Sequence, residues 1–96
     1  MINFDSETAK RALVSLAIET ALLEIGNAMV EEVGNRLYAK HKCYFMDCLE
    51  HPEYLKDVLN QVFGRSHDSI IKSIEKNLAE FANQRPIAEF LAAMSE

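Results

Sequence analysis

Four side chains of the types that bind metal ions lie close together in the middle of this sequence. His41, Cys43, Cys48 and His51 form the pattern His-x-Cys-x4-Cys-x2-His. Structural zinc takes four thiolate or imidazole ligands in a tetrahedral arrangement, so this cluster is a candidate zinc site. It lacks the Cys-x2-Cys pair of common zinc modules. We therefore expect no cofactor and interpret both cysteines as small apolar packing residues, with a zinc site as the alternative.

The same cysteines are candidate nucleophiles. Cysteine catalysis needs a thiol of lowered pKa beside a base, here His51 or His67, and a third group that orients the base. No signature of a cysteine enzyme surrounds Cys43 or Cys48. The sequence therefore predicts a protein that is not an enzyme.

The sequence contains no pattern of a secreted or membrane protein. Its first residues lack the basic stretch of a signal peptide, so we expect a cytoplasmic protein with reduced thiols. The spacing allows a Cys43–Cys48 disulfide, but a reducing compartment disfavours it. The most apolar window, residues 12–25, spans fourteen positions and carries two glutamates, which is too short and too charged to span a membrane.

The charge of the chain disfavours nucleic acid as a partner. The 96 residues carry a formal net charge of −5, and the basic residues form no long cluster. Residues 52–63, 64–66 and 67–81 have the outline of a helix-turn-helix motif. However, Asp68 lies at the start of the segment that would enter the DNA groove, where it would repel phosphates. A DNA-binding regulator is the weakest of the alternatives.

The elements around this cluster are all expected to be helices, in one domain over residues 1–96. Three glycines and two prolines are few turn-forming residues for this length. A first helix is predicted over residues 6–40. Gly26 and Gly34 are weak points that bend or divide it, and we favour one continuous, bent helix over two. One apolar stripe of this helix is formed by positions 14, 18, 22, 25, 29, 33 and 37, and a second by positions 13, 16, 17 and 23.

Three further helices follow from local signals. Pro52 suits a first helical position and Gly64 a C-cap, which predicts a helix over residues 52–63. Ser66 is an N-cap candidate for the next helix, which ends near residue 83, and Pro86 begins a short terminal helix. The fold class is therefore all-α with about four helices: a long first helix, a helical hairpin and a short C-terminal helix.

Two apolar stripes on the first helix predict self-association. A 96-residue chain has too little remaining length to cover both stripes, so we expect a second copy to cover one of them in a helical-bundle homodimer. The expected interface residues lie on the first stripe and are Val14, Ile18, Leu22, Ile25 and Met29.

Residues 44–81, with Cys43 just before them, carry a recognisable series of short motifs: Cys43-Tyr44, Asp47-Cys48, His51-Pro52-Glu53-Tyr54-Leu55, Val58-Leu59, Phe63-Gly64, Ile70-Ile71-x-x-Ile74 and Leu78. This series resembles a family of small archaeal helical domains labelled Nitrososphaera output domain 5, which is common in ammonia-oxidising archaea. The resemblance implies an output or interaction role in signalling and no specific activity.

These observations together predict a non-enzymatic protein-interaction or signalling-output module that acts as a homodimer with an unknown protein partner. The alternative function is a metal- or thiol-responsive regulator that uses the cysteine and histidine cluster described above.

Overall fold

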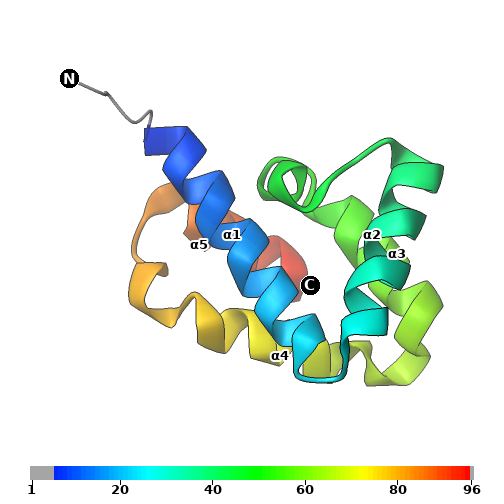
Figure 1. Ribbon diagram of the computed structural model, residues 1–96. Helices are drawn as coiled ribbons and strands as arrows, with labels where there is room; N and C mark the ends of the chain where they lie inside the picture. Colours follow the sequence, from blue (N-terminus) through cyan, green and yellow to red (C-terminus); the bar gives the residue numbers. More distant parts are fainter. Residues whose placement is uncertain (1–5, 96) are drawn as a thin grey trace.

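The computed structural model describes residues 6–95, and in this part of the chain every regular element is a helix (Figure 1). The all-α prediction is confirmed. The elements in chain order are α1 (Ser6–Leu23), α2 (Asn27–His41), the 3-10 helix η1 (Phe45–Leu49), α3 (Pro52–Phe63), η2 (Gly64–Ser66), α4 (His67–Asn77), η3 (Ala79–Phe81) and α5 (Arg85–Ser95).

The segment predicted as one long helix is two helices, which corrects the interpretation that we favoured. α1 ends at Leu23, and the amide groups of Ile25 and Gly26 both bond to the carbonyl of Leu22 in a tight turn. Gly26 then precedes α2 with an extended backbone and no side-chain cap. Gly34, the second predicted weak point, remains inside α2. A Cβ atom there would make ordinary contact, at 3.6 Å, with the ring of Phe45.

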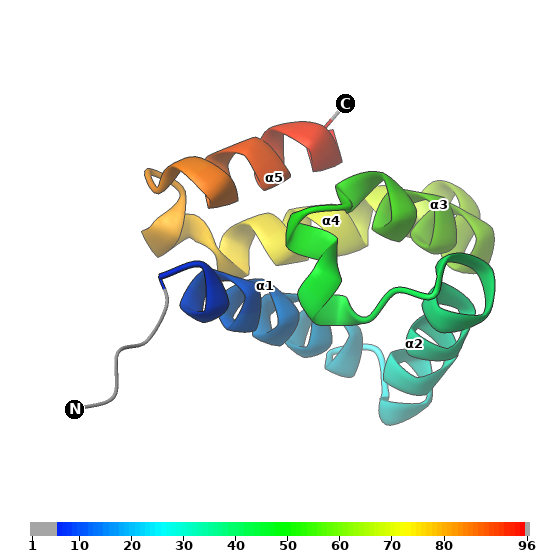
Figure 2. The ribbon, with the colours of Figure 1, turned by 90° about the horizontal axis from the view of Figure 1, so that it is seen from above.

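The helices form two groups with η1 between them. α1 packs against α4 and α5, and α2 packs against α3 as a hairpin (Figures 1 and 2). η1 lies against α1. Arg11 of α1 forms ion pairs with Asp47 of η1 and with Glu50, the residue that follows η1. The segment that carries the predicted cluster thus lies between the two groups of helices.

A single apolar core joins the two groups. It contains side chains from all five α-helices, and Cys43, Cys48 and Leu49 extend it into the segment around η1. Its fully buried large members are Val14, Ile18, Leu22, Val33, Leu37, Leu55, Leu59, Ile74, Leu78, Ile87, Phe90 and Met94.

The helix starts after residue 50 follow the sequence signals closely, but α4 is shorter than predicted. It ends at Asn77 rather than near residue 83, because Leu78 leaves the α-helical conformation, with φ −104° and ψ 6°, and the 3-10 helix η3 follows. α3 begins at Pro52, and Gly64 ends it with a φ of 56°, a left-handed conformation that favours glycine. The Ser66 side chain makes no capping hydrogen bond, whereas the His67 ring nitrogen Nδ1 lies 2.7 Å from the Gly64 carbonyl. Between residues 6 and 95, none of the helices has the length and apolarity that crossing a bilayer requires.

Candidate functional site

The predicted cysteine and histidine cluster occupies the connection from α2 to α3. His41 is the last residue of α2, and Lys42 closes that helix in a left-handed conformation, with its amide bonded to the Leu37 and Tyr38 carbonyls. Cys43 follows, and Cys48 lies within η1. His51 is the residue immediately before α3. The reversal at Lys42 brings the two histidines to the same end of the α2–α3 hairpin.

The two cysteine side chains lie inside the protein and share one acceptor. The exposed fractions of Cys43 and Cys48 are 3% and 0%. Cys43 Sγ lies 3.3 Å, and Cys48 Sγ 3.6 Å, from the carbonyl oxygen of Tyr44, so both thiols donate to the same atom. The expected packing role therefore agrees with their position in the core.

The two histidines stack on a third ring that the cluster prediction did not include. The ring of His41 lies parallel to that of Tyr54 at a centroid distance of 4.2 Å, and His51 stacks on Tyr54 at 4.7 Å. His41 Nε2 also lies 3.0 Å from Asp57 Oδ2, and His51 Nδ1 lies 3.3 Å from Glu53 Oε2. Both imidazoles thus have partners other than the thiols, namely the Tyr54 ring and the carboxylates of Asp57 and Glu53.

The four side chains consequently do not form a zinc site in this structure. No group of three or more histidine, cysteine, aspartate or glutamate side chains within residues 6–95 is arranged to hold a metal ion. Structural zinc needs four such ligands around one point. Here the thiols face the core, while each histidine makes its ring nitrogen contact with a carboxylate of α3.

Local charges and burial shift the pKa of three groups at this site, namely Cys43, Cys48 and Asp57. Burial raises the pKa of the Cys43 thiol, and it raises the pKa of Cys48 by a larger amount. Hydrogen bonds from Lys40 and His41 hold the pKa of the exposed Asp57 carboxyl below its usual value. Both cysteines are therefore neutral thiols near pH 7, which is the opposite of what a nucleophile or a metal ligand needs.

A pocket of about 360 Å³ opens beside this cluster. Cys43 contributes to its wall, whereas Cys48 does not. Polar and aromatic side chains from α2, η1, α3 and the residues that link them make up the rest of the lining, namely His41, Lys42, Asp47, Glu50, His51 and Tyr54. Of the two thiols, Cys43 is thus the one that a small molecule in this pocket reaches first.

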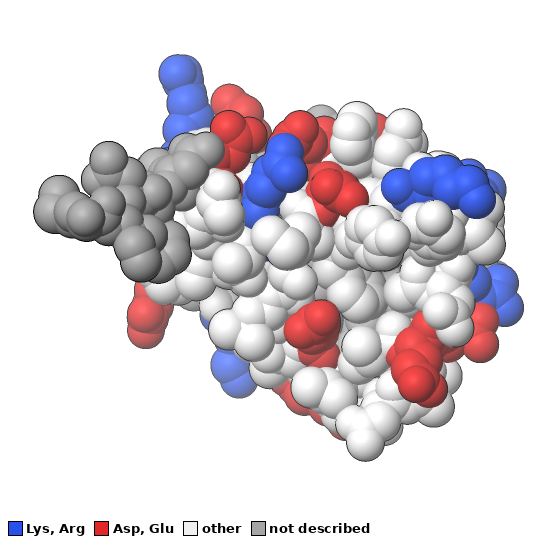
Figure 3. Space-filling view, turned by 45° about the horizontal axis from the view of Figure 1, so that its top comes forward, with Lys and Arg blue, Asp and Glu red and all other residues white. Residues whose placement is uncertain are grey.

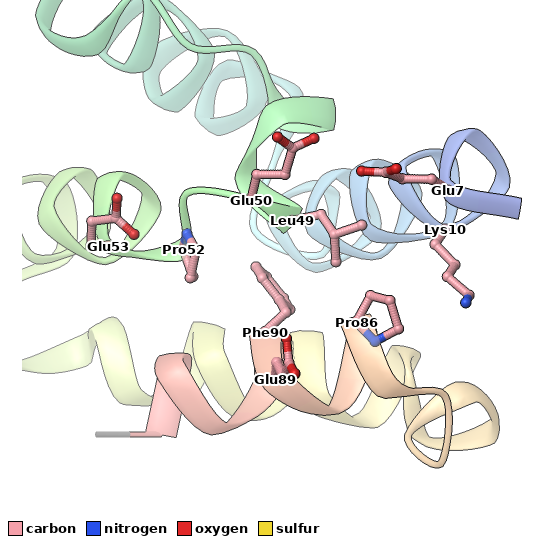
Figure 4. Close-up of a pocket in the computed structure, with 9 residues that line it drawn as sticks. All are labelled: Glu7, Lys10, Leu49, Glu50, Pro52, Glu53, Pro86, Glu89 and Phe90. Carbon is pink, nitrogen blue, oxygen red and sulfur yellow. The ribbon is translucent and has the colours of Figure 1, made fainter. Parts of the chain in front are cut away.

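A larger pocket, of about 670 Å³, lies where the first turns of α1, α3 and α5 meet. Leu49 and Phe90 point into it, and Glu7, Lys10 and Glu50 lie around them (Figure 4). Carboxylates are favourable at the starts of helices because they face the positive end of the helix dipole. Arg11 also pairs with the carboxylates of Glu7 and Glu50. Helix starts and ion pairs thus account for this acidic rim.

Tyr54 and Asp57 are the site residues that the sequence reasoning missed. With His51 they are spaced three apart along α3, and this spacing places all three on one side of that helix. That signal was present in the sequence. Their contact with His41 depends on the antiparallel packing of α2 against α3, which local spacing does not specify.

The expected interface residues of the first helix occupy two kinds of environment. Val14, Ile18 and Leu22 are fully buried in the core of their own chain, so they need no second copy to cover them. Ile25, in the turn after α1, is 52% exposed, and Met29 is half-buried. Leu16 and Leu23, which belong to the second predicted stripe, are 60% and 50% exposed.

Comparison with models of protein families, with curated proteins and with solved structures finds no match to this chain. The resemblance of residues 44–81 to the output domain 5 family therefore stays a prediction that rests on the motifs quoted above.

Proposed function

We propose that this chain is a non-enzymatic protein-interaction module, with a signalling-output role, that acts as a homodimer. The observation that carries the proposal is the exposure of large apolar side chains on the outer side of α1. Leu16 and Leu23 lie seven residues apart on this helix, so they share one face, and Ile25 follows in the next turn. We call these three residues the outer face of α1.

Further exposed apolar residues lie on α2, on η1 and at the residue before η1. Tyr38, Tyr44 and Met46 each expose at least 40% of their surface, and the Tyr38 and Tyr44 rings lie 5.2 Å apart. Tyrosine is among the residues that contribute most to binding energy at protein interfaces. Figure 3 shows an uncharged band across the centre of one side of the molecule, with acidic groups above and below it.

A second copy is the occupant that we propose for this face, which is apolar at Leu16, Leu23 and Ile25 and carries Glu19 and Glu24 beside them. Each chain carries a net charge of −5, so the contact must bury enough apolar surface to outweigh the repulsion between two copies. A stable interface buries about 800 Å² on each partner. Against the 5992 Å² of accessible surface of one chain, this is about an eighth, which one side of the molecule can supply.

The state of the cysteines supports a role without catalysis. Burial raises the pKa of Cys43 and of Cys48, so each is a poor nucleophile at neutral pH. The histidines beside them are engaged with Tyr54 and with carboxylates. These contacts position side chains for packing rather than for proton transfer.

Sedimentation equilibrium of the full chain tests the proposal. We expect the wild type to dimerise, and the double variant Leu16→Glu/Leu23→Glu to be a folded monomer, because two added carboxylates on each copy would face each other across the contact. Ala88→Glu/Ala92→Glu is the matched control. It adds the same charge to exposed positions of α5 and should still dimerise.

Two outcomes would contradict the proposal. One is a wild type that stays monomeric at roughly 1 mM, the concentration range of very weak association. The other is a Leu16→Glu/Leu23→Glu variant that remains a folded dimer, which would place the contact elsewhere. Circular dichroism of each variant establishes that it is folded.

A further inference from the structure

Cys43 and Cys48 are arranged as a pair of thiols that can react with each other. Both sulfur atoms lie within 3.6 Å of the Tyr44 carbonyl oxygen, and the two thiols are also within hydrogen-bonding reach of one another. The backbone between them turns tightly, because the Asp47 amide bonds to the same Tyr44 oxygen at 3.0 Å. This turn brings side chains five residues apart into contact.

The surroundings of the pair favour a disulfide over a metal complex. A bound metal ion needs thiolates, and two thiolates would place two negative charges in the core. Burial disfavours that charge, and so do the carboxylates of Asp47 and Glu53 near both sulfurs. A disulfide is neutral and apolar, so it fits the same site without such a cost.

Access to the pair is unequal. Cys43 lines the pocket of about 360 Å³ between the end of α2 and the start of α3, whereas Cys48 is fully buried behind it. An oxidant that enters the pocket therefore meets Cys43 first. Cys48 is then the neighbouring thiol that can react with the oxidised Cys43.

We propose that Cys43 and Cys48 are a redox pair that a small hydroperoxide converts to an intramolecular disulfide. The reacting form is the Cys43 thiolate, which is a small fraction at neutral pH because burial raises the pKa of this thiol, so the step is slow near pH 7 and becomes faster as the pH rises. The thiolate attacks the terminal peroxide oxygen and the O–O bond breaks. This gives Cys43 sulfenic acid, and the leaving oxygen takes up the thiol proton to become an alcohol, or water from hydrogen peroxide. The Cys48 sulfur then attacks the Cys43 sulfur, and the hydroxyl group leaves as water. The two thiols supply the two electrons and two protons that reduce the peroxide. This chemistry does not depend on the proposed homodimer.

Mass spectrometry of the intact chain after treatment with hydrogen peroxide tests the proposal. We expect the wild type to lose about 2 Da and to recover its mass with dithiothreitol, as two thiols joined in a disulfide do. Two single variants distinguish the cysteine that reacts with peroxide from the cysteine that then forms the disulfide. Cys48→Ala should gain about 16 Da, or multiples of it, on Cys43. Cys43→Ala should react much more slowly than Cys48→Ala, because Cys48 does not line the pocket.

A second measurement covers the case in which a cysteine variant fails to fold. Phenylarsine oxide condenses with two adjacent thiols without oxidising them, so we expect one molecule to bind to each wild-type chain. Absence of this adduct on the folded protein would overturn the proposal. Two results with peroxide would also contradict the proposal. One is a wild type that forms only oxygen adducts or disulfides between chains. The other is a wild type that stays unmodified while Cys48→Ala is oxidised.

Discussion

Helix α1 has two apolar sides, and they meet different surroundings. On the inner side, Val14, Ile18 and Leu22 are completely buried against the rest of the chain. On the outer side, Leu16 and Leu23 are half or more exposed. Both sides carry large aliphatic side chains, so the presence of such side chains does not by itself decide which side enters the core. The neighbours decide it, since the inner residues belong to the same buried core as side chains of η1, α4 and α5.

The largest expected difference between the two sides comes from burying a charge. Ile18→Asp should abolish folding, because an ionised carboxylate in the core costs several kcal/mol or more, a large fraction of the roughly 5–15 kcal/mol that stabilises a small domain. Leu16→Asp makes a similar change two residues away and should alter the free energy of unfolding by about 0.5 kcal/mol or less in the monomer. Thermal melts followed by circular dichroism measure both. Equal losses would contradict the assignment of the sides.

Two adjacent leucines allow a finer comparison. Leu22→Ala should lower the free energy of unfolding by about 2–5 kcal/mol, because it leaves a cavity in the core. Leu23→Ala removes the same atoms from an exposed position and should cost about 0.5 kcal/mol or less. Urea denaturation at a protein concentration low enough to keep the chain monomeric gives both values. A Leu23→Ala loss as large as that of Leu22→Ala would mean that the outer side is covered within the monomer.

The smallest predicted effects concern two glycines, Gly26 in the turn between α1 and α2 and Gly34 within α2. Gly34 lies inside α2 with room for a Cβ atom, so Gly34→Ala should raise the free energy of unfolding by about 1 kcal/mol. Gly26 lies in the turn with an extended backbone and no atom within 4 Å of an added Cβ, so Gly26→Ala should change it by only about 0.5 kcal/mol. If both substitutions stabilised the protein equally, the two helices would form one continuous helix in solution.

Local signals in the sequence predict the starts of α3, α4 and α5 and the end of α3, but they do not predict the end of α4 at Asn77. Pro52 and Gly64 bound α3, and Pro86 lies in the first turn of α5, because each of these residues limits the backbone in its own way. The division at Gly26 was not decided by the sequence, since Gly26 and Gly34 are each followed by asparagine and look alike. Tertiary packing separates them, as the Phe45 ring lies against Gly34 within α2.

In the candidate site, too, local sequence signals do not predict what depends on tertiary packing. The spacing of His41, Cys43, Cys48 and His51 indicates that these residues are neighbours, and the structure does bring them to one end of the α2–α3 hairpin. Spacing does not specify which way each side chain points. Burial turns the thiols inward, while Tyr54 and carboxylates of α3 hold the histidines. These contacts depend on how the helices pack, which the short motifs do not encode.

The position of the three tyrosines has a consequence for spectroscopy. The sequence contains no tryptophan, so tyrosine dominates its near-ultraviolet emission, and all three tyrosines lie between residues 38 and 54. Two of them form the pair of rings near η1, and the third stacks with both imidazoles. Tyrosine emission therefore reports on the α2–η1–α3 part of the molecule, whereas far-ultraviolet circular dichroism reports on every helix. Coincident melting of the two signals would show that both parts unfold in one cooperative step.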